Sequence, residues 1–313
     1  MQVIEHLPSF KEQYQHCVAT IGKYDGMHYG HQSILRQVID ESRALGLPSL
    51  VILSEPQPEE FFRGEEAPAR LNHFEDKVAF LESFGIDLVY RMNFDYALSQ
   101  LSAERFISEV LVSGLGVKSL LVGDDFHFGK ARQGNFELLE SAGESLGFVV
   151  SAQEPCCQSG ERVSSTLVRT YLELGDCERV KQLLGRYYNI SGTVVQGKQL
   201  GRELGVPTAN IHLGTKPLPL QGVFAVAVVV GGKQLLGVAN IGYKPTVDQG
   251  KVASLEVHIF DFEKDIYGEH MQVSFLKKIR NEMKFSGLDA LKEQIKIDIV
   301  QAKNILSEKL SSI

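Results

Sequence analysis

Up to residue 184, short apolar runs alternate with longer segments in which apolar residues recur at i, i+3 and i+4. The runs show no strict apolar–polar alternation, which is typical of strands buried on both faces. A repeated strand-then-helix order predicts a doubly wound parallel α/β sheet, or Rossmann-like fold. The predicted strands are CVATIG (17–22), SLVIL (49–53), DLVYRM (87–92), SLLVG (119–123) and FVVSA (148–152). The predicted helices are 31–46, 73–85, 103–114 and 135–147, followed by 164–176 and 177–185.

The pattern changes from residue 185 onward, where Gly, Pro and Asp turns separate apolar runs that have no helix between them. Such runs predict an antiparallel sheet or a closed β-barrel. The predicted strands are 191–197, 223–233, 234–242, 254–262 and 271–279, and the amphipathic segment 287–310 predicts one long C-terminal helix. We therefore expect two domains, 1–184 and 185–313.

Length and charge agree with this division and exclude some partners. A chain of 313 residues exceeds what one hydrophobic core usually organises. The net charge of −7 argues against a nucleic-acid partner, which needs a basic surface. No apolar stretch reaches membrane length, so we expect a cytoplasmic protein with no membrane partner. The four cysteines form no C-x-x-C pair, which favours reduced thiols over a zinc or disulfide framework.

The segment GKYDGMHYGHQ (22–32) is dense in glycine and histidine and follows the first predicted strand. It predicts a strand end, a glycine-rich turn and a helix N-terminus, where exposed N–H groups favour an anion. His28 and His31 would then face a nucleotide phosphate. The plainer interpretation is a tight turn that carries two surface histidines.

A second polar segment, SSTLVRTYL (164–172), lies far downstream. Its hydroxyls could be a simple N-cap, but together with Arg169 they could close over a triphosphate. A His-x-x-His turn after the first strand, combined with this helix start, resembles the nucleotidyltransferase superfamily that uses HIGH-type motifs. The resemblance implies transfer of a nucleotidyl group with release of pyrophosphate.

A third segment, VGDDFHFGKARQGN (122–135), is either a surface loop or an aromatic site. Phe126 and Phe128 are costly to leave in water, and their faces could hold a flat ring.

In the second half, GKQLGRELGVPTAN (197–210) is not a Walker A loop. Thr208 and Asn210 lie two apart, so in an extended segment both point to one face and offer hard oxygen ligands suited to Mg²⁺. In SLEVHIFDF (254–262), Glu256 lies opposite the apolar positions and is a candidate general base, unless that face is simply solvated. Arg280 could meet a phosphate or a ring edge, or belong to a solvated basic cluster.

Taken together, the chain resembles the family of bacterial bifunctional riboflavin kinase/FMN adenylyltransferases over nearly its whole length. The matching segments, in the family's order, include GKYDGMHYGHQ, EPQPEEFF, VGDDFHFGKARQGN, VSSTLVR, SGTVVQGKQLGRELGVPTANI, GVANIGYKPT, LEVHIFDFEKDIYG and IRNEMKFSGLDALKEQI. The resemblance implies phosphorylation of riboflavin to FMN in the C-terminal half and adenylylation of FMN to FAD in the N-terminal half. ATP would be the co-substrate and Mg²⁺ the cofactor, and the partners would be small molecules: riboflavin, FMN, FAD and ATP.

The resemblance also implies roles for individual residues. Glu256, His28, His31 and Arg169 would be catalytic. Nucleotide would bind at Gly22, Asp25, Gly26, Ser165, Thr166, Gly197, Arg202 and Thr208. Flavin would bind at Asp125, Phe126, Phe128 and Arg280, and the metal at Thr208 and Asn210.

Two other functions remain open from the residues. Lys23, Ser54 and Gln57 depart from the residues common in the family, so one alternative is a riboflavin kinase with an impaired adenylyltransferase site. The other is a flavin- or nucleotide-binding protein without catalytic turnover.

Overall fold

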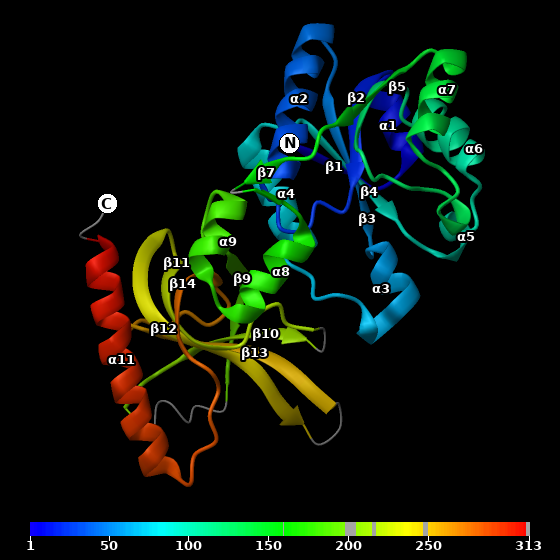
Figure 1. The fold of residues 1–313 in the computed structure, drawn as a ribbon. Helices are drawn as coiled ribbons and strands as arrows, with labels where there is room; N and C mark the ends of the chain where they lie inside the picture. The colour runs from blue at the N-terminus through cyan, green and yellow to red at the C-terminus, as the bar shows by residue number, and fades with distance from the viewer. Residues whose placement is uncertain (159, 198–204, 215–216, 247–249, 311–313) are drawn as a thin grey trace. The chain divides into compact units, whose positions relative to one another are not determined.

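The computed structural model describes residues 1–158, 160–197, 205–214, 217–246 and 250–310 (Figure 1). The chain divides into two compact units. The first comprises Met1–Pro68 and Asn72–Ser164, and the second comprises Ala69–Leu71 and Ser165–Ile313. Helices α8 (Ser165–Leu174) and α9 (Cys177–Leu184) thus group with the second unit. The domain boundary at residue 184 stays a prediction.

The first unit is built on a six-stranded parallel sheet with the order β1-β4-β3-β2-β5-β6. The strands are β1 (Gln2–Ile4), β2 (Cys17–Gly22), β3 (Ser49–Glu55), β4 (Leu88–Asn93), β5 (Val117–Gly123) and β6 (Val149–Gln153). All five predicted strands are confirmed. The sequence missed β1, because a three-residue edge strand with one buried position carries no periodic signal.

Alternate residues of these strands enter two separate cores, as a doubly wound sheet requires. On one face, Val18, Val51 and Leu53 pack with side chains of helices α2 (Tyr29–Leu45) and α4 (Phe74–Phe84). On the other, Ala19 and Ile52 pack with side chains of α1 (Leu7–Gln13) and α7 (Phe136–Leu146). The remaining elements of this unit are α1 (Leu7–Gln13), α3 (Pro58–Arg63), η1 (Gly64–Glu66), α5 (Tyr96–Ser99), α6 (Ala103–Arg105), η3 (Lys130–Arg132), α7 (Phe136–Leu146) and the hairpin β7 (Cys157–Gln158) and β8 (Glu161–Arg162).

One predicted α-helix is in part a π-helix. The segment 103–114 begins as α6, but η2 (Phe106–Val112) is a π-helix. Apolar spacing does not separate i+5 from i+4 hydrogen bonding over two turns, so the sequence could not reveal it.

The second unit contains a closed antiparallel barrel with the order β10-β13-β12-β11-β14-β9. Its strands are β9 (Asn189–Val195), β10 (Ala209–Gly214), β11 (Gly222–Val230), β12 (Lys233–Thr246), β13 (Gly250–Ile259) and β14 (His270–Arg280). The prediction of a barrel is confirmed. Strand β10 was missed, because its run ANIHLG is short and follows a stretch rich in Gly and Pro.

Helix α11 (Leu288–Leu310) confirms the predicted C-terminal helix and covers the outside of the barrel (Figure 1). Its Ala302 and Leu306 pack with Val223 of β11, Val238 of β12 and Leu276 of β14. In the part of the chain that the structure describes, no helix is both long and apolar enough to span a membrane.

Candidate active sites

The turn between β2 and α2 sits at the carboxyl end of the strand where the sheet order reverses, the position at which doubly wound sheets bind ligands. Three of its residues have left-handed backbones: Tyr24 (φ 48°), Gly26 (φ 89°) and Met27 (φ 49°). Such a conformation is costly for Tyr and Met and clusters at functional sites. Buried Asp25 accepts a bond from the Asn72 amide, and the Gly26 amide donates to Asn72 Oδ1, so these bonds hold the turn.

His28 and His31 are brought together at the start of α2. Their rings are stacked with centroids 3.7 Å apart. Nδ1 of His28, the N-cap residue, accepts from the His31 amide at 3.3 Å. Because Nδ1 accepts, the proton of the neutral ring lies on Nε2, which can donate to a ligand. Gly30 permits this arrangement, since a Cβ there would lie 3.2 Å from the His28 ring.

Both imidazoles are held neutral by their surroundings. Burial lowers the pKa of His28 to about 4. Burial, and then the charges of His28, Lys77 and Lys23, lower the pKa of His31 well below its usual range. His31 Nδ1 is enclosed and has no hydrogen-bond partner among the described residues. A neutral Nε2–H donor on His28 near two lysines suits an anion, because the positive charge of the lysines attracts one.

The two lysines are fixed in different ways. Lys77 of α4 is buried, and its Nζ donates to the Lys23 carbonyl at 2.7 Å. Lys23 itself forms an ion pair with Glu59 of α3 at 2.6 Å. The ion pair thereby connects α3 to the histidine turn. Gln57, the N-cap residue of α3, is buried, and its Nε2 has no hydrogen-bond partner in the described part of the chain.

The predicted aromatic loop contributes one of its two phenylalanines to the hydrophobic core. Phe128 is buried, lies 5.5 Å from Phe106 between ring centroids, and stacks on half-buried Phe126 at 5.6 Å. Asp125 is exposed and lies 3.7 Å from Arg162. Of the three predicted flavin residues in this loop, Asp125 is exposed, Phe126 is half-buried and Phe128 is buried against Phe126. Flavin binding by the loop stays a prediction.

Ser165, Thr166 and Arg169 lie on α8, in the second unit. Arg169 Nε donates to the Ala69 carbonyl of the short segment 69–71 at 2.6 Å. That bond ties this segment to α8. The roles of Ser165, Thr166 and Arg169 in nucleotide binding and catalysis stay predictions. Arg202 lies outside the described residues.

On the barrel, strand register aligns three polar residues in a row. Glu256 of β13 pairs with Asn210 of β10 on one side and with Asn240 of β12 on the other. Neighbouring Leu255 and Val257 are fully buried in the barrel, whereas Glu256 is half-buried. Glu256 therefore lies on the outer face, flanked by two amides whose β-carbons are about 5 Å away. The row provides a carboxylate between two hydrogen-bonding groups.

The metal ligands predicted from PTAN lie at one end of this row. Asn210 Nδ2 donates to the Thr208 carbonyl at 3.3 Å, which sets the orientation of the amide. An added Cβ at Gly197 would lie 2.6 Å from Asn210 Nδ2 and 2.8 Å from Oδ1. His258 Nδ1 donates to the Pro207 carbonyl at 2.9 Å and holds the segment on β13. Gly197, Thr208 and Asn210 are therefore brought together beside Glu256.

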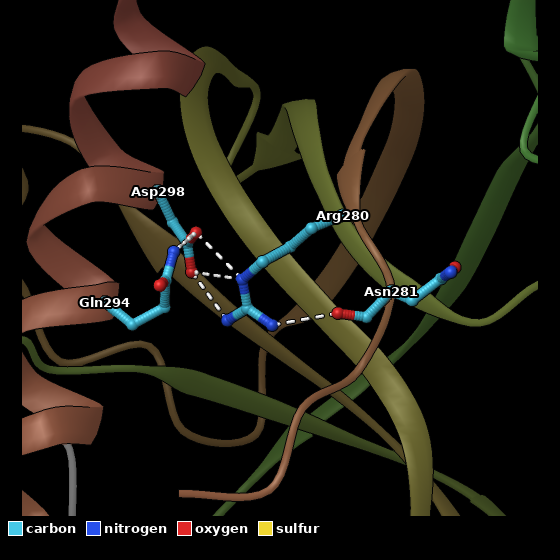
Figure 2. A network of polar contacts seen from close by, with 4 residues as sticks. All are labelled: Arg280, Asn281, Gln294 and Asp298. Carbon is cyan, nitrogen blue, oxygen red and sulfur yellow. Dashed lines mark hydrogen bonds and ion pairs between the residues drawn. The ribbon is translucent and has the colours of Figure 1, made fainter.

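Arg280 is directed elsewhere. Its guanidinium binds the carboxylate of Asp298 on α11, with Nη2 2.7 Å from Oδ2 (Figure 2). Its predicted contact with flavin stays a prediction, and the bond that the structure shows is to Asp298.

A pocket of about 410 Å³ opens next to this arginine. Its walls combine the apolar segment 218–220 and adjacent Gln221 with polar side chains from elsewhere in this unit: Glu173, Lys278, Asn281 and Glu282. The carboxylate of Glu282 lies against Gly242, which is two residues from Asn240 on the same face of β12. Glu282 therefore lines the pocket and also contacts β12, the strand that carries Asn240.

Comparison with known proteins gives the family. Residues 10–167 match the FAD synthetase family model, and residues 184–306 match the riboflavin kinase model. A bifunctional riboflavin kinase/FMN adenylyltransferase of Haemophilus influenzae is 44% identical over 97% of this chain and 98% of its own. The protein of that name from Escherichia coli is 46% identical over 92% of both chains. The chain belongs to this family.

A solved structure agrees with the fold. A crystal structure described as a macrolide-efflux protein from Streptococcus pneumoniae superposes with a TM-score of 0.79 at 27% identity, over 95% of this chain and 96% of that one. It supports the architecture of both units.

Four residues that the structure places beside the predicted site residues were not predicted from the sequence. Lys77 lies within the apolar helical stripe Phe74–Leu81, and Asp298 lies one turn before Ala302 and Leu306 in the stripe of α11; a charge in such a stripe is a detectable signal. Asn240 stands between buried Ala239 and Ile241. His258 lies two residues after Glu256 and therefore on the same face of the strand. The pairing of Asn240 with Glu256 needs the strand register, which the sequence does not provide.

Proposed function

We propose that this chain phosphorylates riboflavin to FMN on the outer face of its barrel and adenylylates FMN to FAD at the turn that carries His28 and His31. The observation that supports the first site best is the row in which Glu256 lies between Asn210 and Asn240. A half-buried carboxylate between two amides suits a general base.

In the kinase step, Glu256 takes the proton from the ribityl 5′-hydroxyl while that oxygen attacks the γ-phosphorus of ATP. A new O–P bond forms, and the bond to the β-phosphate oxygen breaks to release ADP. General-base catalysis of this kind contributes about 10²- to 10⁴-fold in rate.

Thr208 and Asn210 would hold Mg²⁺ together with the ATP phosphates. The fit rests on their hydroxyl and amide oxygens, which are hard ligands, and on Gly197, which leaves room for the Asn210 side chain. Few protein ligands are expected, because Mg²⁺ keeps waters and binds phosphates. Bound there, Mg²⁺ supplies neutralisation of the charge that develops on the transferred phosphoryl group.

The pocket beside Glu282 would receive the flavin ring. Its volume of about 410 Å³ lies within the range of about 300–1,000 Å³ usual for small-molecule sites. Leu218 and Leu220 offer apolar walls, and Gln221 and Asn281 offer hydrogen bonds to a ring edge. The ribityl chain would then extend toward Glu256.

In the adenylyltransferase step, an FMN phosphate oxygen attacks the α-phosphorus of ATP and pyrophosphate leaves. The attacking group is already ionised, so no general base is needed, and positioning and charge stabilisation carry the catalysis. Neutral His28 donates from Nε2, and Lys77 and Lys23 add positive charge. Because both steps consume ATP, we propose a cytoplasmic enzyme.

Substitution of one site at a time tests this proposal. Glu256→Gln should abolish FMN formation from riboflavin and leave the conversion of supplied FMN to FAD intact. His28→Ala should do the reverse. Chromatographic separation of riboflavin, FMN and FAD over time gives both rates in one assay. Loss of both activities in either folded variant would contradict the two-site proposal.

A further inference from the structure

Helix α11 carries one buried charge in its described part. Asp298 is 3% exposed and precedes Ala302 and Leu306, also buried, at intervals of four residues. It therefore occupies the stripe by which the helix packs on the barrel. A carboxylate in such a stripe is costly unless it is paired and hydrogen-bonded.

The partner of Asp298 is Arg280, at the end of β14 (Figure 2). Arg280 Nε donates to Oδ1 at 2.9 Å and to Oδ2 at 3.1 Å, and Nη2 donates to Oδ2 at 2.7 Å. Gln294, one turn earlier on α11, donates from Nε2 to Asp298 Oδ1 at 2.9 Å. The carboxylate is thus fixed from two sides, and the guanidinium is held in one plane.

The same guanidinium organises the segment that follows β14. Its Nη1 donates to the Asn281 carbonyl at 2.9 Å, and its carbon lies 5.7 Å from the centre of the Phe285 ring. Arg280 therefore contacts both ends of segment 281–285. Residues 281–284 are exposed, so the segment has little burial of its own to fix its path.

Segment 281–285 forms part of the pocket on the barrel. Asn281 and Glu282 line it together with Lys278, and the Glu282 carboxylate lies against Gly242 of β12. A change in the path of this segment would therefore alter the pocket wall and the contact of Glu282 with β12, the strand that carries Asn240.

We propose that Asp298 is a positioning residue for the riboflavin kinase reaction, which acts through Arg280 to keep segment 281–285 in the form that binds the flavin ring. This inference rests on the proposed flavin pocket. Stability alone does not require the ion pair, because apolar residues of similar volume often replace a buried pair without loss. The distinctive consequence of the pair is the fixed direction of Arg280 Nη1 toward Asn281.

The test measures riboflavin binding and both activities in the full chain. Asp298→Asn removes the charge at constant shape, and Asp289→Asn, on the exposed first turn of α11, is the matched control. Asp298→Asn should raise the Kd and the KM for riboflavin by about tenfold or more, equivalent to about 1.4 kcal/mol. The KM for ATP and the conversion of FMN to FAD should stay at wild-type values, and the control variant should be unchanged throughout.

Two further variants separate positioning from folding. Adding Asp298→Asn to Arg280→Gln should cause no further loss of riboflavin affinity if Asp298 acts through Arg280. The double variant Arg280→Met/Asp298→Met should fold, because no charge is left unpaired, yet should retain the weak riboflavin binding. Wild-type riboflavin affinity in either folded Asp298 variant would overturn the inference. If the wild-type chain itself failed to bind or phosphorylate riboflavin, the proposed function would fail instead.

Discussion

Gly197 is the position at which one added carbon should affect one activity and leave the other intact. In Gly197→Ala, the new Cβ would lie 2.6 Å from Asn210 Nδ2, 2.7 Å from Cγ and 2.8 Å from Oδ1. Carbon atoms pack at about 3.5–4.0 Å, so the Asn210 side chain would have to withdraw by roughly 1 Å. Asn210 is only 9% exposed, which leaves it little space to move.

A displacement of that size is large for a catalytic group. Misplacement by about 1 Å can cost about 10²-fold in rate, which corresponds to about 2.7 kcal/mol of transition-state stabilisation. We therefore expect Gly197→Ala to lower kcat/KM for riboflavin phosphorylation about 100-fold and to raise the Mg²⁺ concentration needed for half-maximal rate.

The assay follows FMN formation at varied Mg²⁺ and ATP, with the conversion of FMN to FAD as an internal control for folding. Gly287→Ala is the matched control variant, because a Cβ at Gly287 would meet no atom within 4 Å. Wild-type kcat/KM and Mg²⁺ dependence in Gly197→Ala would refute the proposal that Asn210 holds Mg²⁺. Equal loss of both activities would instead indicate a folding defect.

Two predictions concern the histidine turn. Gly30→Ala should lower the rate of FMN adenylylation about 3- to 10-fold and leave the kinase rate unchanged, because the new Cβ would lie only 3.2 Å from the His28 ring and displace it. An unchanged rate of FAD formation would contradict this prediction. The free energy of unfolding should also fall as the pH is lowered from about 6.5 to about 4. In this range the unfolded chain binds a proton at His28, whereas the folded chain keeps His28 neutral because its pKa is about 4. The loss is roughly 3 kcal/mol, and denaturant unfolding should show less of it in His28→Asn, which keeps an N-cap acceptor but does not titrate.

The parallel sheet was predictable because its strands are apolar on both faces. Leu50, Val51, Ile52 and Leu53 are all nearly inaccessible, and alternate members of this run belong to different cores. Near-continuous apolar runs of this kind are typical of parallel strands covered on both faces. The three-residue edge strand β1 and the π-helix have no such signature.

The sequence predicted which segments contain the site residues, but not how these residues contact one another. Residue type and spacing identified the His28 turn and the outward position of Glu256. The structure adds contacts across distant parts of the sequence: Lys77 with Lys23, Asn240 with Glu256, and Asp298 with Arg280. Such pairs depend on register and helix packing, so a single sequence does not determine them.

The most direct test of two sites in one chain is a time course with the purified protein, riboflavin, ATP and Mg²⁺. We expect FMN to appear first and FAD to follow as FMN is consumed, and we expect supplied FMN to yield FAD without the first step. Accumulation of FMN without FAD, even when FMN is supplied, would contradict an active adenylyltransferase at the His28 turn. Absence of any FMN from riboflavin would contradict the kinase site at Glu256.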